Sequence, residues 1–124
     1  SALIFADVRV KHAHPLGAVR GVEGLSDEAK EVFGRGRADA LILSGVATGA
    51  PADPEDFRRV REVLPDAPLV AGSGVNLDNL EEFWGVTDGM IVGSSLKEQG
   101  DARSPVDPDR ARDFLTAAAR LRRP

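Results

Sequence analysis

The sequence predicts an α/β fold with one four-stranded parallel sheet, and two observations support this prediction. Four short apolar runs, at residues 3–10, 40–43, 68–71 and 89–92, each precede a segment with helical periodicity. Alternation of strands and helices at this spacing favours parallel strands joined by right-handed crossovers. No linker or shift in composition divides the 124 residues, so we expect a single domain over residues 1–124.

The first unit combines a strand at residues 3–10 with the helix that follows it. The run is rich in apolar and β-branched residues, which are typical of strands. Ser26, followed by two acidic residues, predicts the N-cap and the first turn of a helix. We expect Gly34 and Gly36 to end that helix.

The second unit has the clearest helix signals of the chain. After the strand at residues 40–43, Asp53 and Pro54 place an N-cap directly before a proline at the first helical position. Pro65 then ends the predicted helix, because proline does not continue one.

The third and fourth units carry shorter signals. Asn76 or Asp78 can cap a short helix after the strand at residues 68–71. The fourth strand, residues 89–92, is followed by a polar loop and then by a helix over residues 107–122. The apolar residues of that last helix recur with helical spacing.

The number of units points to a (βα)4 half of a TIM (β/α)8 barrel, with helices on one face of the sheet. A complete barrel needs about 250 residues, roughly twice the length of this chain. An open flavodoxin-like sheet is the alternative, but it requires helices on both faces. A half barrel leaves its other face and both edge strands open. We therefore expect a homodimer or a higher homo-oligomer that closes a barrel.

The composition excludes several classes of function. The chain has no cysteine, which excludes disulfides, thiol nucleophiles and cysteine metal sites. A net charge of -4 and 5% aromatic residues argue against a nucleic-acid partner. No apolar run approaches the roughly 20 residues of a membrane-spanning helix, so we expect no integral membrane segment and a cytoplasmic location. The first residue, Ser1, indicates a fragment or a trimmed chain.

Two tripeptides rich in glycine and serine follow the last two predicted strands. They are Gly72-Ser73-Gly74 and Gly93-Ser94-Ser95. Glycine lets a backbone approach an anion, and amide and hydroxyl groups can then bind it. Phosphate sites of barrels often use the loops after the last two strands. The sequence therefore predicts a site for a phosphate-containing small molecule, with tight turns as the alternative and with Lys97 as an added charge or a surface residue.

Asp7, Lys11 and His12 are the candidate catalytic residues. Asp7, Arg9 and Lys11 alternate along the first strand and share one face. Three charges fit poorly beneath a helix layer, so we expect them to point into the barrel, as acid or base groups or as a salt-bridged layer. His12 could act as a general acid or base or could anchor a loop. With His14 it could offer two metal ligands, and no further ligand stands out apart from Asp7, so we expect no metal, and we expect no cofactor.

The segment around the second strand carries two further signals. Ser44, Thr48 and Gly49 could contact a ligand, with a flexible connecting loop as the alternative. Asp39 opens the second strand as Asp88 opens the fourth. This weak similarity indicates two related βαβα halves.

Four motifs together resemble the BtpA/SgcQ family. They are FADVRVKHA at residues 5–13, ADALILSG at residues 38–45, GSGVN at residues 72–76 and DGMIVGSSLK at residues 88–97. They are spread over essentially the whole chain and are specific as a set. The resemblance implies a TIM-barrel relationship, in which the four units correspond to strands five to eight of a full-length barrel.

The resemblance also implies candidate functions. The family is named for a protein associated with photosystem I biogenesis at the thylakoid membrane, and other members sit beside sugar-utilisation genes. We therefore expect a phosphate-binding half barrel without an established activity. The alternatives are an enzyme, or half of a split enzyme, that processes sugar phosphates or nucleosides, and an assembly factor of the photosystem-biogenesis type.

Overall fold

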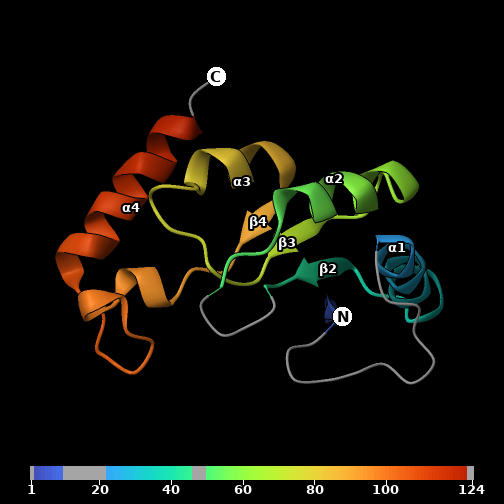
Figure 1. Cartoon of the computed structure of the whole chain (residues 1–124), viewed down its shortest axis with the longest axis horizontal. Coiled ribbons are helices and arrows are strands. Elements are labelled where there is room, and N and C mark those ends of the chain that lie inside the picture. Colours follow the sequence, from blue (N-terminus) through green and yellow to red (C-terminus); the bar gives the residue numbers. More distant parts are fainter. Residues whose placement is uncertain (1, 10–21, 46–49, 123–124) are drawn as a thin grey trace.

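A computed structural model describes residues 2–9, 22–45 and 50–122 of the chain. Within these residues it contains four strands and the intervening helices, in the order that the sequence predicts (Figure 1). The strands are β1 (Phe5–Val8), β2 (Ala40–Leu43), β3 (Leu69–Ala71) and β4 (Gly89–Met90). The helices are α1 (Val22–Lys30), its π-helical continuation η1 (Glu31–Arg35), α2 (Pro54–Val63), α3 (Leu80–Val86), the 3-10 turns η2 (Ser94–Leu96) and η3 (Glu98–Gly100), and α4 (Pro108–Leu121).

The four strands form one parallel sheet in the order β1-β2-β3-β4. The register places Asp7 opposite Ile42, and Ile42 opposite Val70. Val70 in turn lies opposite Gly89. Consecutive strands that lie side by side in chain order are the arrangement of a (β/α)8 barrel. The predicted α/β half-barrel fold is therefore confirmed.

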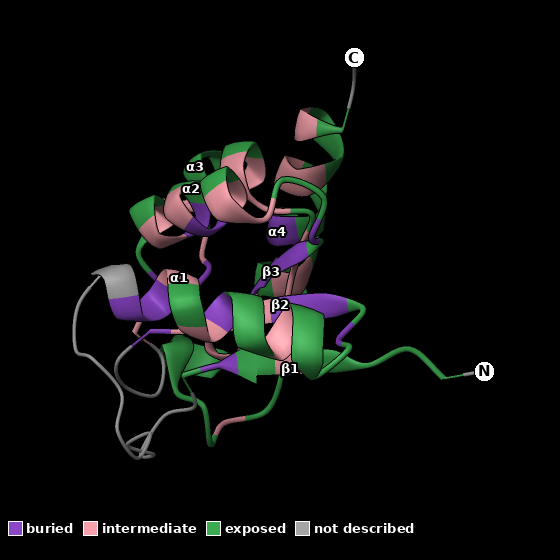
Figure 2. Cartoon of the chain, turned by 90° about the vertical axis from the view of Figure 1, so that its right-hand side faces the viewer, coloured by how far each residue is buried: buried purple, intermediate pink, exposed green. Residues whose placement is uncertain are grey.

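The helices lie along one face of the sheet, each beside the next in chain order (Figures 1 and 2). We call the other side of the sheet the open face. Phe5 and Ile91 alternate with residues that face the helices, so they point to the open face. They are 55% and 51% exposed, respectively. None of the helices among the described residues is long and apolar enough to cross a membrane.

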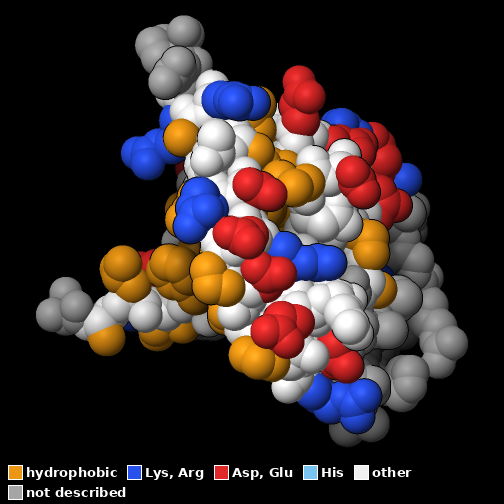
Figure 3. All heavy atoms as spheres, turned by 90° about the vertical axis from the view of Figure 1, so that its left-hand side faces the viewer, with side chains coloured by type: hydrophobic (Ala, Val, Ile, Leu, Met, Phe, Trp, Pro, Cys, Tyr) orange, Lys and Arg blue, Asp and Glu red, His pale blue; other side chains and the backbone are white. Residues whose placement is uncertain are grey.

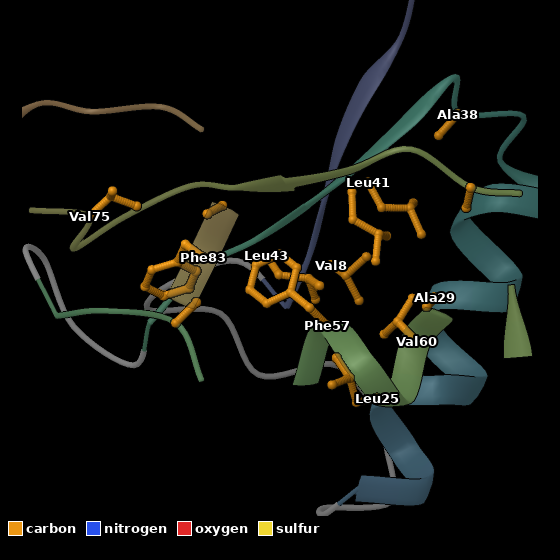
Figure 4. Close-up of a cluster of buried hydrophobic side chains, with 14 of the residues drawn as sticks. Val8, Leu25, Ala29, Ala38, Leu41, Leu43, Phe57, Val60, Val75 and Phe83 are labelled. Carbon is orange, nitrogen blue, oxygen red and sulfur yellow. The ribbon is translucent and has the colours of Figure 1, made fainter. Parts of the chain in front are cut away.

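The hydrophobic core lies between the sheet and the helices (Figure 4). Phe57 of α2 and Phe83 of α3 are 0% and 1% exposed, and their rings meet edge to face with centroids 5.9 Å apart. Leu41 and Leu69, on neighbouring strands, are fully buried beneath these helices. Truncating one such phenylalanine to alanine lowers the free energy of unfolding by about 3–5 kcal/mol. The core therefore holds the sheet, and with it the strand ends, in place.

The first helix differs from its prediction. α1 begins at Val22, so Ser26 lies inside the helix and is not its N-cap. The earlier start brings Leu25 into the core at 4% exposure, and this packing outweighs the local capping preference. Gly34 lies within η1, and the helical segment ends at Gly36.

The other helices follow their predicted caps more closely. The side chains of Asp53 and Asp107 accept hydrogen bonds from the first-turn amides of α2 and α4, as predicted. The N-cap position of α3 is Asn79, and not Asn76 or Asp78. The Asn76 side chain accepts hydrogen bonds from the Asp78 and Asn79 amides, so it shapes the turn before the helix.

Candidate functional site

The ends of β3 and β4 border a cavity of about 400 Å³, which we call the strand-end cavity. Gly72-Ser73-Gly74 and Gly93-Ser94-Ser95 both line it. Arg110, from the first turn of α4, is also part of the wall. The structure therefore brings all six residues of the predicted phosphate site to one place.

The tripeptide after β3 is fixed by its packing against the loop before α2. Gly74 has a φ of +72°, and a Cβ atom there would overlap the backbone of Pro51, so only glycine fits without strain. Ser73 is 8% exposed. Its Oγ accepts a hydrogen bond from the Gly45 amide at 2.8 Å and donates one to the Ala50 carbonyl at 2.8 Å. The Ser73 hydroxyl hydrogen is thus already used inside the protein.

Two further hydrogen bonds hold the loops that surround the cavity. The Ser95 hydroxyl donates to the Val75 carbonyl at 2.8 Å, which ties the segment after β4 to the segment after β3. The Asn79 side-chain amide donates to the Gly74 carbonyl at 2.9 Å. The hydroxyl hydrogen of Ser95, like that of Ser73, is therefore used to hold a neighbouring segment of backbone.

The segment after β4 supplies unused donors. Among the described residues, the amides of Gly93, Ser94 and Ser95 and the hydroxyl of Ser94 have no hydrogen-bond acceptor. Backbone amides grouped in this way can bind an anion. These donors, which bond to no other described residue, are therefore the ones that could donate hydrogen bonds to a phosphate oxygen.

Arg110 brings a positive charge to the same wall. Its Nη1 donates to the Ser95 carbonyl at 3.3 Å, and its Nε lies 3.9 Å from Oδ2 of Asp107. The Arg110 side chain is 45% exposed, and its Nη2 has no acceptor among the described residues. The sequence did not identify Arg110 as a site residue, although its place in the helix turn after Asp107 is a usable signal.

Lys97 takes the second of its two predicted roles. Its Nζ donates to the Ala102 carbonyl at 2.5 Å, and its backbone pairs with Val106 across the loop that precedes α4. Lys97 does not line the strand-end cavity. It holds a surface loop, and Arg110 supplies the cation of the cavity.

The candidate catalytic residues lie apart from this cavity where the structure describes them. Asp7 is exposed and points to the open face from β1, at the opposite edge of the sheet from β4. Lys11 and His12 lie outside the described residues, as does His14. Within the described part of the chain, no group of three His, Asp or Glu side chains could hold a metal ion.

Arg9 does not share the orientation of Asp7, and the prediction that it points into the barrel is wrong. β1 ends at Val8, and Arg9 has a φ of 60°, which breaks the alternation of the strand. The Arg9 Nε donates to Oε2 of Glu28 at 2.8 Å. The ion pair with α1 turns this arginine toward the helix layer.

The predicted ligand contacts after β2 are only partly described. Ser44 is half-buried, and its Oγ would overlap a Cβ atom on Gly72, so the two residues pack closely across the sheet. Thr48 and Gly49 lie outside the described residues. Ser44 therefore lies next to the strand-end cavity without lining it.

Two aspartates tie the beginnings of strands together at the other end of the sheet. Oδ2 of Asp39 accepts the Ile4 amide at 2.7 Å, before β1 begins. Oδ2 of Asp88 accepts the Leu69 amide at 2.8 Å, where β3 begins. Asp88 also pairs with Arg61 of α2 at 2.6 Å. The similarity of the Asp39 and Asp88 segments thus has a structural counterpart.

Two carboxyl groups among the described residues have displaced pKa values, and both lie outside the strand-end cavity. Burial raises the pKa of Asp88, but the hydrogen bonds from Arg61 and from the Leu69 amide outweigh it and lower the pKa below its usual value. Burial, followed by the nearby charge of Asp53, raises the pKa of Asp56.

Known proteins that are similar to this chain align with nearly all of it, including the residues of the strand-end cavity. The chain matches the model of the BtpA family over residues 1–120. It is 40% identical over 119 residues to an uncharacterized protein of Thermococcus kodakarensis, covering 96% of this chain and 43% of that protein. It is 40% identical over 116 residues to the photosystem I biogenesis protein BtpA of Synechocystis sp., covering 94% and 39%. The putative sgc region protein SgcQ of Escherichia coli is 28% identical over 129 residues, covering 92% and 48%.

The chain spans less than half the length of these relatives, between 39% and 48% of each. This share is consistent with four βα units of the eight in a barrel. The family match extends over both tripeptides of the strand-end cavity and over all four strands. The chain belongs to the BtpA family.

Proposed function

We propose that the chain is half of a (β/α)8-type barrel whose strand-end cavity binds the phosphate group of a small phosphorylated ligand. One observation carries this proposal: Gly93, Ser94 and Ser95, whose amides have no acceptor among the described residues, line one cavity together with Arg110. Charge-assisted hydrogen bonds from such donors are suited to phosphate oxygens. A volume of about 400 Å³ also leaves room for a small organic moiety beside the phosphate.

Binding of inorganic phosphate, measured by isothermal titration calorimetry, tests this proposal. A Cβ atom on Gly93 meets nothing within 4 Å, so Gly93→Asp adds a negative charge to the cavity without a clash. We expect this variant to weaken phosphate binding at least about tenfold through charge repulsion. Gly85→Asp on α3 is the matched control, because Gly85 is equally unobstructed and lies outside the cavity.

Arg110→Ala tests the charge that the cavity receives from α4. We expect about tenfold weaker phosphate binding, because a charge-assisted hydrogen bond is lost. Arg103→Ala is the control, since Arg103 is 91% exposed and lies outside the cavity. The proposal fails if the wild-type chain does not bind phosphate, or if the cavity variants and the controls behave alike.

The second part of the proposal assigns the open face and both edge strands to a second copy of the chain. Phe5 and Ile91 are more than half exposed on the open face, and β1 and β4 each have one unpaired edge among the described residues. A two-fold dimer covers this face and both edges at once. Analytical ultracentrifugation at micromolar concentration should show a particle of twice the chain mass, and a stable monomer would contradict closure by a second copy.

An enzymatic function is a second candidate, and the position of Asp7 favours it. Asp7 is an exposed carboxylate on the open face, in the second half of β1, toward the end of the sheet that carries the strand-end cavity. With Lys11 and His12 it could supply acid or base groups to a sugar phosphate or a nucleoside bound in a closed barrel. Product formation from a panel of such compounds, and its loss in Asp7→Asn but not in Asp109→Asn, would support this candidate. A chain that binds phosphate without turning over any of them would leave binding as its function.

A further inference from the structure

We propose that β1 of a second copy enters beside β4, beneath α4, and that Arg122 then pairs with Asp39 of that copy. The inference rests on the proposed closure by a second copy. It specifies which strands meet at each seam, the contact between the two copies, and which ion pair aligns these strands. Three observations support it, one from each edge of the sheet and one from the internal repeat.

The first observation is a second cavity, of about 650 Å³, between α3, β4 and α4. We call it the seam cavity. Trp84, Met90 and Phe114 line it with apolar side chains, while Asp88 and Arg122 add charges. In a (β/α)8 barrel the outer helices cover the grooves between neighbouring strands. The helix that follows the last strand, α4, therefore lies over a place where a further strand belongs.

The second observation is an exposed apolar segment at the other edge of the sheet. Leu3, Ile4 and Phe5 are 72%, 51% and 55% exposed. The segment that leads into β1 projects from the body of the fold, and apolar side chains gather on it (Figures 2 and 3). Ile4 lies on the same side of the strand as Val8, which is buried beneath the helices. Ile4 is therefore placed to be covered by a helix, and α4 of a second copy provides that helix.

The third observation is that only one of the two aspartates at the strand beginnings has an arginine partner among the described residues. Asp88 holds the Leu69 amide and pairs with Arg61, which lies in the last turn of α2, the helix that precedes β3. Asp39 holds the Ile4 amide, but no Lys or Arg among the described residues pairs with it.

A second copy supplies the missing arginine. In a closed dimer, the helix that precedes β1 around the barrel is α4 of the other copy. That helix ends at Leu121, and its C-cap residue is Arg122. Arg122 lines the seam cavity together with Asp88 and has no anionic partner among the described residues. Arg122 of one copy therefore corresponds to Arg61, and Asp39 of the other copy corresponds to Asp88.

Disulfide cross-linking tests which strands meet. The chain has no cysteine, so introduced cysteines are unique. Ile4 and Met90 lie at opposite edges of one sheet, so a disulfide in the variant Ile4→Cys/Met90→Cys must join two copies. We expect oxidation to convert most of this variant to covalent dimer. The control Ile4→Cys/Leu77→Cys should stay uncoupled, because Leu77 is as exposed as Ile4, at 52%, but lies outside the seam cavity.

A double-mutant cycle tests the ion pair through the dimer Kd, measured by sedimentation. Arg122→Ala and Asp39→Asn should each raise the Kd about fivefold per seam, and hence about 25-fold for the two seams of a dimer. The double variant should be no weaker than either single variant, because both remove the same pair. Arg112→Ala is the control and should leave the Kd unchanged, since Arg112 lies on α4 but pairs with Asp109 at 3.1 Å.

The outcomes separate this inference from the proposals on which it rests. Cross-linking at positions 4 and 90 together with a non-additive cycle supports the seam. A dimer that neither cross-links there nor loses affinity in Arg122→Ala overturns the seam and leaves closure by another contact. A monomeric wild-type chain overturns both the seam and closure by a second copy. Phosphate titration reports on the strand-end cavity in each case.

Discussion

The two βαβα halves of the chain are alike where their strands begin and differ where their strands end. Asp39 and Asp88 each hold the amide at the beginning of the preceding strand. At the opposite end, the segment after β2 is hydrogen-bonded within the protein, since the Gly45 amide donates to the Ser73 hydroxyl oxygen. The segment after β4, residues 93–95, keeps its amides directed to no other described residue and borders the strand-end cavity.

This difference shows that small residues after a strand do not by themselves make a ligand site. The segments after β2 and β4 are both rich in glycine and serine. A Cβ atom on Gly45 would overlap the backbone of Ala50, whereas one on Gly93 would meet nothing within 4 Å. In the first case glycine serves close packing, and in the second it leaves space. The surroundings of each glycine decide which role it has.

The largest expected effect contrasts the two glycines of the strand-end cavity. Gly74→Ala should destabilise the chain by about 3 kcal/mol, because a side chain at positive φ is strained and meets Pro51. Gly93→Ala should cost less than about 1 kcal/mol, since its surroundings are open. Urea unfolding of the two variants measures the difference. Equal losses would show that the segments after β3 and β4 are packed alike.

A smaller effect contrasts the two aspartates. Asp88→Ala should cost about 2 kcal/mol, because it leaves a partly buried Leu69 amide without its acceptor and removes the partner of Arg61. Asp39→Ala should cost less than about 1 kcal/mol, because water can replace the carboxylate at the exposed Ile4 amide. Urea unfolding at a concentration where the chain is monomeric isolates this difference. A larger loss of stability in Asp39→Ala than in Asp88→Ala would contradict this prediction.

Much of the fold could be predicted from the sequence because its signals are local. Asp53-Pro54 and Asp107-Pro108 mark helix starts within a few residues, and short apolar runs mark the strands. Ser26 shows where such signals fail. A good capping residue there was outweighed by the burial of Leu25, which depends on a sheet formed by distant residues.

The candidate site was predictable in its location but not in the use of its groups. The order of strands brings residues after β3 and β4 together, so the two tripeptides had to be neighbours. Whether Ser73 and Ser95 offer their hydroxyl hydrogens to a ligand depends on carbonyls that only the folded loops place nearby. The Asp107 cap places Arg110 in the first turn of α4, but only the direction of that helix in the fold brings Arg110 to the cavity.

The smallest expected effect is the pH dependence of the Asp88 tie. The pKa of Asp88 in the folded chain lies below the ordinary value of 3.8, so the charged form is favoured by folding. Its stabilisation is complete above that ordinary value and is lost as the pH falls through the lower, folded-state pKa. The difference in urea midpoint between the wild-type chain and Asp88→Asn should therefore stay constant from neutral pH to about pH 5 and shrink below it.

Arg61→Ala provides the control for this pH profile. Among the described residues, Arg61 lowers the pKa of Asp88 both through its hydrogen bond and through its charge, while burial and the Leu69 amide remain in this variant. In the Arg61→Ala background, the effect of Asp88→Asn should be smaller and nearly independent of pH. A profile that keeps its shape without Arg61 would assign the lowered pKa to the Leu69 amide. Asp88 would then hold its strand as Asp39 does, through the backbone alone, and the ion pair would no longer distinguish the two halves.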